Sequence, residues 1–521
     1  MTSSPDDGNR PSLAILCLAV FAGALAVRVV LACARPVPMT VDAAYYLMVA
    51  ENLAAGRGLV ADYVWNYLAG VPDGLPVPSN AYWMPGTSLV AAAAYALAKD
   101  TSLRVAQWPP LIFGALLCSI TAWIAGALTK RRGPALLAGA AAALNYYLVE
   151  LSFFPDHFML YAVLVNLALI GLWTAWQGSA SYALVAGATA GLAYLTRTDA
   201  GLLVIVAAIL ALGFRRRARR RHNLRIALFF IIAFIVVAAP WWVRQTHAFG
   251  SPSGANPLRT AFLTDYNDLL RLDQSHLNIK DYWGTNQRVA FLFKGYVLYR
   301  SLRVLAKATM LVGLLAIAAL FISRIRRESL PWLIYTPIGL LVPALIVPYA
   351  AVKGGSWHMM PAFLPIILAL GSAFAIEVHL RVPSRLRPGL WLLILGVFLS
   401  PASWWLNPPP DAARSNAPLY PPVAAQAGRA LGTDAGPVLT DNAWGLYSIA
   451  RIPCAQFPTD GADAALTVAD TIGAKHFITR ADAPDQIPTT AEVIDHPRFS
   501  PLARYPAGET NLLVYRILPL E

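Results

Sequence analysis

Blocks of apolar residues alternate with short polar segments along most of the 521-residue chain. A block of about 20 residues crosses a hydrocarbon core of ~30 Å as an α-helix rising ~1.5 Å per residue. The pattern therefore predicts a polytopic α-helical membrane protein with about 11 spans, in a range of 11–13. The eleven stretches are residues 12–34, 108–129, 134–154, 158–177, 182–195, 199–214, 226–243, 303–323, 331–350, 359–380 and 388–406.

Basic residues cluster between alternate apolar blocks, at Lys130–Arg132, Arg215–Arg221, Arg324–Arg327 and Arg381–Arg387. If the N-terminus is inside, all four runs fall on the cytoplasmic side, as the positive-inside rule requires. The sequence thus predicts a multi-pass protein of the cytoplasmic (inner) membrane, with its C-terminal region outside.

Residues 86–98 are apolar but too few to cross the core. Counting them as a span would also move Lys130–Arg132 outside, so we expect an interfacial or re-entrant helix here. Two large outer loops then result, at residues 35–107 and 244–302, together with a short outer turn near residues 153–157.

Composition supports a membrane protein and argues against a nucleic-acid partner. Hydrophobic residues make up 57% of the chain and charged residues 13%. The net charge of +13 comes from Lys and Arg concentrated in loops, and the four cysteines show neither a disulfide framework nor paired zinc spacing.

A change of composition at Asn407 separates two predicted domains. The segment "NPPPDAARSNAPLYPP" has the composition of a linker, and beyond it strand-like and helix-like patterns alternate. We expect a transmembrane domain over residues 1–406, followed by a small extracytoplasmic α/β domain over 407–521.

Polar residues at the predicted outer face are the candidates for chemistry. Asp42 follows the first span, where it is either a helix N-terminal acid or a functional carboxylate. Asp156 and His157 lie in a short outer turn, which is equally consistent with simple solvation. Arg197 either pairs with Asp199 or binds a lipid phosphate, whose oxygens its guanidinium matches.

Further cations lie at the same face. The second outer loop is basic despite facing outside, and its residues include Arg244 and Arg259, for which anionic lipid phosphate is the expected partner. Lys353 and His358 flank another outward turn, although His358 also fits a satisfied interface histidine.

Five segments between residues 40 and 370 occur in an order that resembles the GT-C membrane glycosyltransferases, particularly the protein-mannosyltransferase-like and aminoarabinose-transferase-like group of glycosyltransferase family 39. The segments are "VDAAYYLMVAENLAAGRGL", "AYWMPGTSLVAAAAYAL", "LTRTDAGLL", "PWWVRQTHAFGSP" and "HMMPAFLPIILAL". The chain departs from the family pattern at Ala43, where an acid is common, at Met84, and at Thr198, which replaces a proline.

The resemblance implies a GT-C fold and a hexosyl- or pentosyltransferase. Such an enzyme moves sugar from a polyprenyl-phosphate donor to a glycan, protein or lipid acceptor outside the membrane, with inversion. Asp42 would be the general base, and Asp156 would assist it or bind sugar or acceptor hydroxyls. The donor phosphate would be bound by Arg197, Arg244, Arg259, Lys353 and His358. Sugar or acceptor would contact Tyr45, Tyr46, Tyr82, Trp83 and His157, although packing is the commoner role of such aromatics. No cofactor is implied; a divalent metal is compatible with the sequence but required by no motif.

Two other functions are compatible with a membrane protein of this kind. A secondary transporter or lipid flippase would place polar residues deep within spans, where Arg28 is the clear charge and its long stem allows it to reach outward. A non-catalytic scaffold that binds through residues 407–521 would make no use of Asp42.

Overall fold

The structure is a computed structural model that describes residues 12–213, 220–255, 257–284, 287–400, 431, 436–481, 495–507 and 510–519. Most of the basic run Arg215–Arg221, the end of the predicted span 388–406 and the predicted linker at 407–422 lie outside the described residues.

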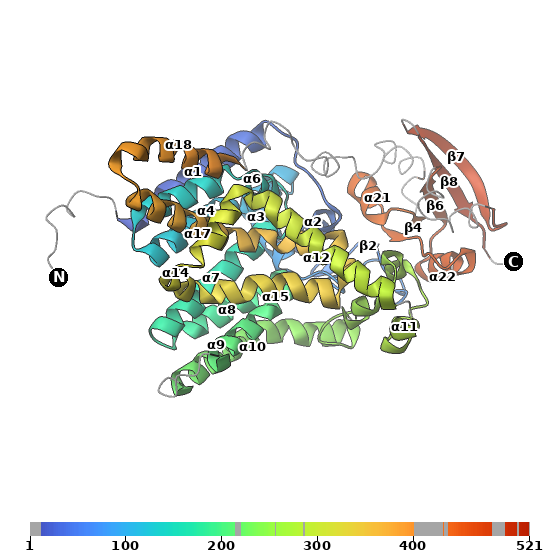
Figure 1. The fold of residues 1–521 in the computed structure, drawn as a ribbon. Helices are drawn as coiled ribbons and strands as arrows, with labels where there is room; N and C mark the ends of the chain where they lie inside the picture. The colour runs from blue at the N-terminus through green and yellow to red at the C-terminus, as the bar shows by residue number, and fades with distance from the viewer. Residues whose placement is uncertain are drawn as a thin grey trace.

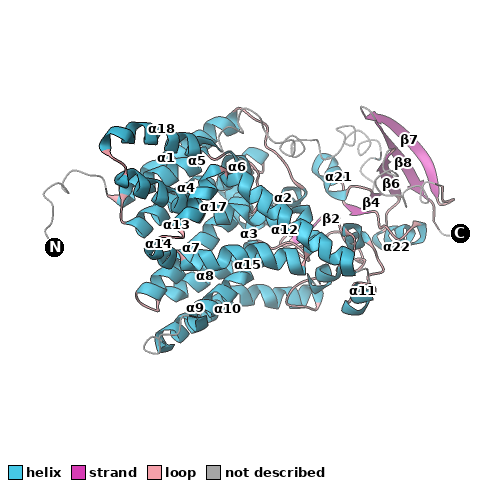
Figure 2. Cartoon of the chain, viewed as in Figure 1, coloured by secondary structure: helices cyan, strands magenta, loops and turns pink. Residues whose placement is uncertain are grey.

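Helices form a bundle that makes up most of the molecule, and strands gather beyond one end of it, near the C-terminus (Figures 1 and 2). Helices suit apolar blocks because each satisfies its backbone hydrogen bonds internally. The bundle contains α1 (Leu13–Cys33), α4 (Leu103–Thr129), α5 (Arg132–Leu144), α6 (Tyr146–Leu151), α7 (Phe158–Gln177), α8 (Tyr182–Thr196), α9 (Leu202–Gly213), α10 (Arg220–Phe249), α12 (Gln287–Thr309), α13 (Leu311–Ala319), α14 (Ser323–Glu328), α15 (Leu330–Ile346), α16 (Pro348–Ala350), α17 (Ser356–Arg381) and α18 (Arg387–Leu399).

Among the described residues, five helices are long and apolar enough to cross a membrane, and two bent helix pairs raise this number to as many as seven. The five are α1, α4, α7, α10 and α17. The predicted multi-pass helical class is confirmed. The count of eleven stays a prediction, because the remaining helices are shorter than a bilayer crossing or, like the 23-residue α12, pass the test of length and apolarity only as part of a bent pair.

Two predicted spans need correction. Residues 303–323 are not one helix: α12 and α13 meet at 98° around Met310, whose φ of +46° lies outside the right-handed helical region. Residues 331–350 also bend, because Pro348, which has no N–H, follows α15 where the chain turns by 113°. Since α12 begins at Gln287, the predicted loop 244–302 is partly helical.

Arg28 in α1 is fully buried and does not reach outward, contrary to expectation. Its Nε donates to Ser152 Oγ at 3.0 Å, and one terminal nitrogen donates to the Ala24 carbonyl at 3.2 Å. The guanidinium therefore faces the bundle interior, where hydrogen bonds offset part of the cost of burying its charge.

The first outer loop contains α2 (Val41–Ala54), α3 (Gly86–Ala98) and three short strands, β1 (Val60–Ala61), β2 (Tyr63–Val64) and β3 (Val77–Pro78). After α2 the chain reverses through Gly56 and Gly58, whose φ values of +75° and +83° favour glycine. Helix α3 packs against α2 and α4. It is a separate short helix, as its length predicts, and its place relative to a membrane stays a prediction.

The remaining outer segments are short. The described part of the second outer loop contains the 3₁₀ turns Pro257–Phe262 and Tyr266–Leu270 and helix α11 (Ile279–Gly284). Further short turns occupy Thr198–Gly201 after α8 and Ala351–Gly355 before α17, while Ser384–Leu386 before α18 lies in the basic run predicted to be cytoplasmic.

A six-stranded sheet lies next to the C-terminus, with strand order β2-β5-β4-β6-β8-β7. Its first four strands run parallel and its last two are antiparallel to their neighbours. The elements are β4 (Val438–Thr440), α21 (Ala443–Ala450), β5 (Cys454–Gln456), α22 (Ala462–Ile472), β6 (His476–Arg480), β7 (Phe499–Ala507) and β8 (Thr510–Ile517). One edge strand, β2, belongs to the first outer loop. A domain boundary at residue 407 stays a prediction, since a strand from residues 1–406 completes this sheet.

Candidate active site

Asp42 lies in the first turn of α2, directly after the residue that caps this helix. Thr40 is the N-cap, and its hydroxyl accepts the Ala43 N–H at 2.9 Å. This cap, together with the favourable placement of an acid at a helix N-terminus, explains why the chain turns into a helix just here.

The outer turn before α7 meets the start of α2. The Thr40 hydroxyl donates to Asp156 Oδ2 at 2.6 Å, and the His157 N–H donates to Asp156 Oδ1 at 2.7 Å. The Asp156 side chain is fully enclosed. Thr40 therefore joins two predicted site segments through one hydroxyl, which caps α2 and binds the Asp156 carboxylate.

Arg197 ends α8 and brings the other segments together. Its Nε donates to Asp199 Oδ2 at 2.9 Å, and a second nitrogen also bonds this carboxylate, so the predicted Arg197–Asp199 pair forms. The other end of the guanidinium lies 2.9 Å from His157 Nε2 and 3.1 Å from His358 Nδ1. The structure thus unites segments that are 40 and 161 residues away from Arg197 in sequence.

These contacts assign the protons of both imidazoles. A guanidinium can only donate, so the ring nitrogens that face Arg197 must accept. The proton of His157 is then on Nδ1, which lies 2.5 Å from Asp156 Oδ1 without the alignment of a hydrogen bond. Burial, and next the charge of Arg197, lower the pKa of His157 well below its usual value, consistent with a neutral ring.

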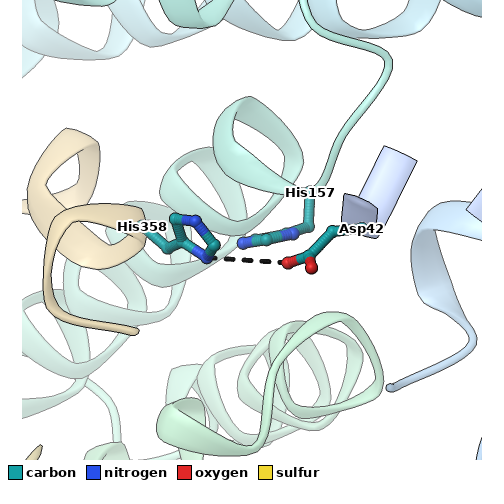
Figure 3. A group of neighbouring side chains, drawn as sticks. All are labelled: Asp42, His157 and His358. Carbon is teal, nitrogen blue, oxygen red and sulfur yellow. Dashed lines mark ion pairs between the residues drawn. The ribbon is translucent and has the colours of Figure 1, made fainter. Parts of the chain in front are cut away.

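Asp42, His157 and His358 point toward one another (Figure 3). Asp42 Oδ2 lies 3.8 Å from His358 Nδ1. Although 20% of its side chain stays accessible, burial raises the pKa of Asp42 to about 7; repulsion from Asp156 adds to this, while Arg197 and Trp83 partly offset it. A carboxylate with a pKa near neutrality is well matched to general-base chemistry.

Burial also raises the pKa of Asp156 to about 6, against the hydrogen bonds from Thr40 and the His157 backbone that favour the charged form. Asp42 and Asp156 are two buried carboxyls at one site, and each one's charge opposes ionisation of the other. The pair therefore holds its protons to a higher pH than exposed aspartates do.

The predicted aromatic residues surround Asp42, and most of their surface is buried. Tyr45 packs against Trp83 with tilted rings whose centroids lie 4.4 Å apart, and its hydroxyl accepts the Asn80 N–H at 2.6 Å. Tyr46 meets His157 edge to face at 5.9 Å, and Tyr82 meets Trp83 edge to face at 5.7 Å. Trp83, which is 8% exposed, retains a small accessible edge beside Asp42. These contacts show packing; sugar binding by the same rings stays a prediction.

Three predicted phosphate-binding cations have other partners or lie on the surface. Arg244 donates to the Ser79 and Leu59 carbonyls at 2.7 and 3.2 Å, and so supports the first outer loop. Arg259 bonds Gln274 at 3.3 Å within the second loop. Lys353 is exposed in the turn before α17. Arg197 and His358 meet each other beside Asp42, whereas the phosphate role of Arg244, Arg259 and Lys353 remains a prediction.

Sequence reasoning missed Thr40. A threonine directly before an apolar helix is a recognisable N-cap signal, so its capping role was accessible from the sequence. Its second bond, to Asp156, depends on a contact between residues 116 apart, for which a single sequence gives no signal.

Comparisons with known proteins bear on the fold of the chain. No family model and no curated protein sequence matches the chain. Among solved structures, ArnT from Cupriavidus metallidurans bound to undecaprenyl phosphate superposes with a TM-score of 0.54 at 12% identity, covering 97% of each chain. The oligosaccharyltransferase AglB from Archaeoglobus fulgidus, in complex with an inhibitory peptide and a dolichol-phosphate, gives a TM-score of 0.59 at 14% identity, covering 95% of this chain and 74% of that one.

The chain has the GT-C fold. The resemblance seen in its sequence motifs is confirmed at this level, since both neighbours are GT-C glycosyltransferases. At these identities the likeness establishes the fold, and the chemistry has to be argued from the residues of this chain.

A divalent metal is a further question for this fold, because another AglB structure is a complex with Zn and sulfate. Asp42, His157 and His358 each offer a ligand atom, and these atoms lie within 4.8 Å of one another. However, Arg197 already bonds His157 Nε2 and His358 Nδ1. The observed arrangement does not fit a metal ion, because a guanidinium and a cation would compete for the same nitrogen lone pairs.

Proposed function

We propose that the protein is a membrane glycosyltransferase that moves a hexose or pentose from a polyprenyl-phosphate donor to an acceptor at the outer face of the membrane. The observation that carries this proposal is the partly buried Asp42 carboxylate, 3.8 Å from His358 and near the Arg197 guanidinium that His358 contacts, with a pKa raised to about 7. The GT-C fold supports it, as do the lipid phosphates bound by ArnT and AglB.

The reaction uses the two sides of the site differently. Asp42 takes the proton of the acceptor hydroxyl while that oxygen bonds to the anomeric carbon from the face opposite the phosphate. The bond between the anomeric carbon and the phosphate oxygen breaks, and its electron pair leaves with the lipid phosphate. The sugar is thereby inverted. General-base assistance of this kind contributes about 10²–10⁴-fold.

Arg197 stabilises the negative charge that grows on the departing phosphate. Its side chain is held in place by Asp199, His157 and His358, so it needs little reorganisation as the charge develops. Asp156 holds Thr40 and, through it, the first turn of α2. Further positive charge is available from Arg244, Arg259 and Lys353. These residues contact the donor only if it extends beyond Asp42, Arg197 and His358.

The proposal is tested with membranes from cells that express the wild type, Asp42→Asn or Asp73→Asn. The last variant makes the same change at an exposed aspartate of the same outer loop. Each membrane receives a panel of radiolabelled undecaprenyl-phosphate pentoses and hexoses, and label appearing in envelope glycans, proteins and lipids is measured. We expect transfer from one donor by the wild type and by Asp73→Asn, and its loss in Asp42→Asn.

Transfer at the wild-type rate in Asp42→Asn would remove Asp42 as the base. Failure of the wild type to use any donor in the panel, together with transport of a lipid-linked sugar across the membrane, would favour the transporter or flippase instead. Mass spectrometry of envelope glycans with and without the protein identifies the product.

A further inference from the structure

Helix α2 carries Asp42 at its beginning and is held at its end by a segment from the other end of the sequence. Arg451, which follows α21, forms two bonds with the Glu51 carboxylate, at 2.8 and 3.0 Å. Glu51 lies in the last turn of α2, 400 residues earlier. A two-pronged guanidinium–carboxylate pair fixes orientation as well as distance.

A second set of contacts lies just after α2. The Tyr447 hydroxyl in α21 donates to Asp62 Oδ2 at 2.7 Å, and the Cys454 N–H donates to the Asp62 carbonyl at 3.3 Å. Strand β2 then pairs in parallel with β5, with Tyr63 opposite Cys454. Figure 1 shows α21 beside α2 and β2.

Buried aromatic rings continue this contact to the catalytic end of α2. Tyr447 meets Tyr63 at 5.5 Å between ring centroids, Tyr63 meets Tyr45 at 5.9 Å, and Tyr45 packs against Trp83 at 4.4 Å. Tyr45 follows Asp42 by three residues, so both lie on one face of the helix. A displacement of α21 is therefore transmitted through closely packed rings to the helix turn that carries Asp42.

The hydrophobic core confirms that these contacts form one unit. Residues of α2 and the first outer loop share a single buried cluster with residues of β4, α21, β5, β6 and β8. An appended binding module joined by a linker would bury its apolar residues within itself. The shared members are Tyr45, Tyr46, Met48, Val49, Ala61, Tyr63 and Trp83 from the loop, and Val438, Ala443, Leu446, Tyr447, Cys454, Ile478, Leu512 and Val514 from the C-terminal segment.

We propose that the C-terminal segment is a fixed part of the active site, in which Arg451 and Tyr447 are positioning residues that hold α2 and so set the location of Asp42. The catalytic consequence rests on the proposed transferase function; the structural consequence does not. Arg197 and His358 lie on α8 and α17, so loosening α2 displaces the base relative to the donor-phosphate side.

This separation predicts a specific kinetic result. Displacing a reacting group by about 1 Å costs on the order of 10²-fold in rate. Binding of the donor phosphate, by contrast, depends in this proposal on Arg197 and His358, which lie outside α2. Weakening the contacts that hold α2 should therefore lower kcat and leave KM for the donor nearly unchanged. A variant that is instead destabilised as a whole would melt at a lower temperature and yield less active enzyme.

The test uses charge reversal in the full-length protein: Glu51→Arg, Arg451→Glu and the double exchange. Each single change places like charges together, and the double exchange restores an opposite pair. We expect kcat to fall at least about tenfold in each single variant, with donor KM within about twofold, and to recover to within about threefold in the double variant. Thermal melting of each variant separates loss of fold from loss of position.

The matched control is Asp470→Arg. Asp470 forms the same two-pronged pair with Arg498, at 2.8 and 3.0 Å, in the same C-terminal segment but without contact to α2. Its kcat should stay within about twofold of the wild type, because this pair joins α22 to the residue before β7 rather than to α2. Equal losses in Asp470→Arg and Arg451→Glu, or single variants with unchanged kcat, would contradict the proposal.

Carbodiimide labelling of Asp42, read by mass spectrometry, tests the placement without any transfer activity. Carbodiimides react with the protonated carboxyl. The wild type should be labelled up to a pH of about 7, whereas the single variants admit water to α2 and should lose labelling at lower pH. The double exchange should restore the wild-type profile. Identical profiles in all four proteins would overturn the positioning role even if the transferase assay itself failed.

Discussion

The two outer loops differ in how their predicted site residues are used. The first loop places Asp42 Oδ2 3.8 Å from His358 Nδ1, and the hydroxyl of Thr40 in the same loop bonds Asp156. The second loop has many cations, yet Arg244 supports backbone carbonyls and Arg259 bonds a glutamine of its own loop. Asp42 is held at a capped helix start, whereas Arg244 on α10 and Arg259 in a 3₁₀ turn direct their guanidinium groups to other polar groups. A basic residue type alone was therefore a weaker guide to the site than an acid placed by a helix cap.

The first prediction tests the acid of the first loop and has the largest expected effect. Asp42→Asn keeps size and shape but cannot accept a proton, so kcat should fall about 10²–10⁴-fold. The release of labelled undecaprenyl phosphate from the donor measures this. Loss of less than about threefold would mean that another group is the base.

The second prediction concerns Arg197, which follows α8 and belongs to neither outer loop. Folding of the chain brings its guanidinium to the site. Arg197→Ala removes the positive charge beside the leaving group and should lower kcat about 10²–10³-fold. Arg197→Lys should recover only part of this, because an ammonium cannot bond Asp199 and both imidazoles at once. Full activity in Arg197→Ala would show that residues other than Arg197 stabilise the negative charge of the departing phosphate.

The hydroxyl that ties the first loop to the turn before α7 should matter less. Thr40→Val loses the bond to Asp156 and the cap of α2, together about 1–3 kcal/mol. We expect a lower melting temperature and a kcat reduced about tenfold, whereas Thr40→Ser should retain most of both. Equal values for the valine and serine variants would rule out a role for the hydroxyl.

The smallest effect is expected in the second loop. Arg259→Gln removes a charge whose guanidinium bonds Gln274 within its own loop, so kcat and donor KM should stay within about twofold of the wild type. Donor KM, measured over a range of ionic strength, checks this. A clear rise in KM would show that the donor phosphate reaches the second loop, and would reverse the contrast between the two loops.

Much of the fold was accessible from the sequence because apolar blocks longer than a bilayer crossing specify helices directly. Helices α1, α7 and α17 begin and end within a few residues of the predicted spans. The bend at Met310 was not accessible, since the apolar run continues through it and positive φ has no signature at methionine. Strand β2 was missed for a related reason: two residues carry no periodicity, and only pairing with β5 makes them a strand.

The site was accessible in part. Asp42, Asp156, Arg197 and His358 stand out as polar groups next to spans, and the structure brings them together. Their partners depend on contacts across the chain, so neither the bonds of Arg197 to both histidines nor those of Arg451 to Glu51 follow from local pattern. Residue type and depth selected the candidates; tertiary packing decided which of them meet.

The pH dependence of kcat, measured for the purified wild type beside Asp42→Asn, tests the role of Asp42 most directly. A general base acts when ionised, and burial raises its pKa to about 7. The wild-type rate should therefore be low in acid and rise as the pH passes through about 7, whereas the residual rate of Asp42→Asn should lack this rise. A wild-type profile that is flat across neutrality, or an Asp42→Asn profile with the same rise, would contradict the assignment of Asp42 as the base.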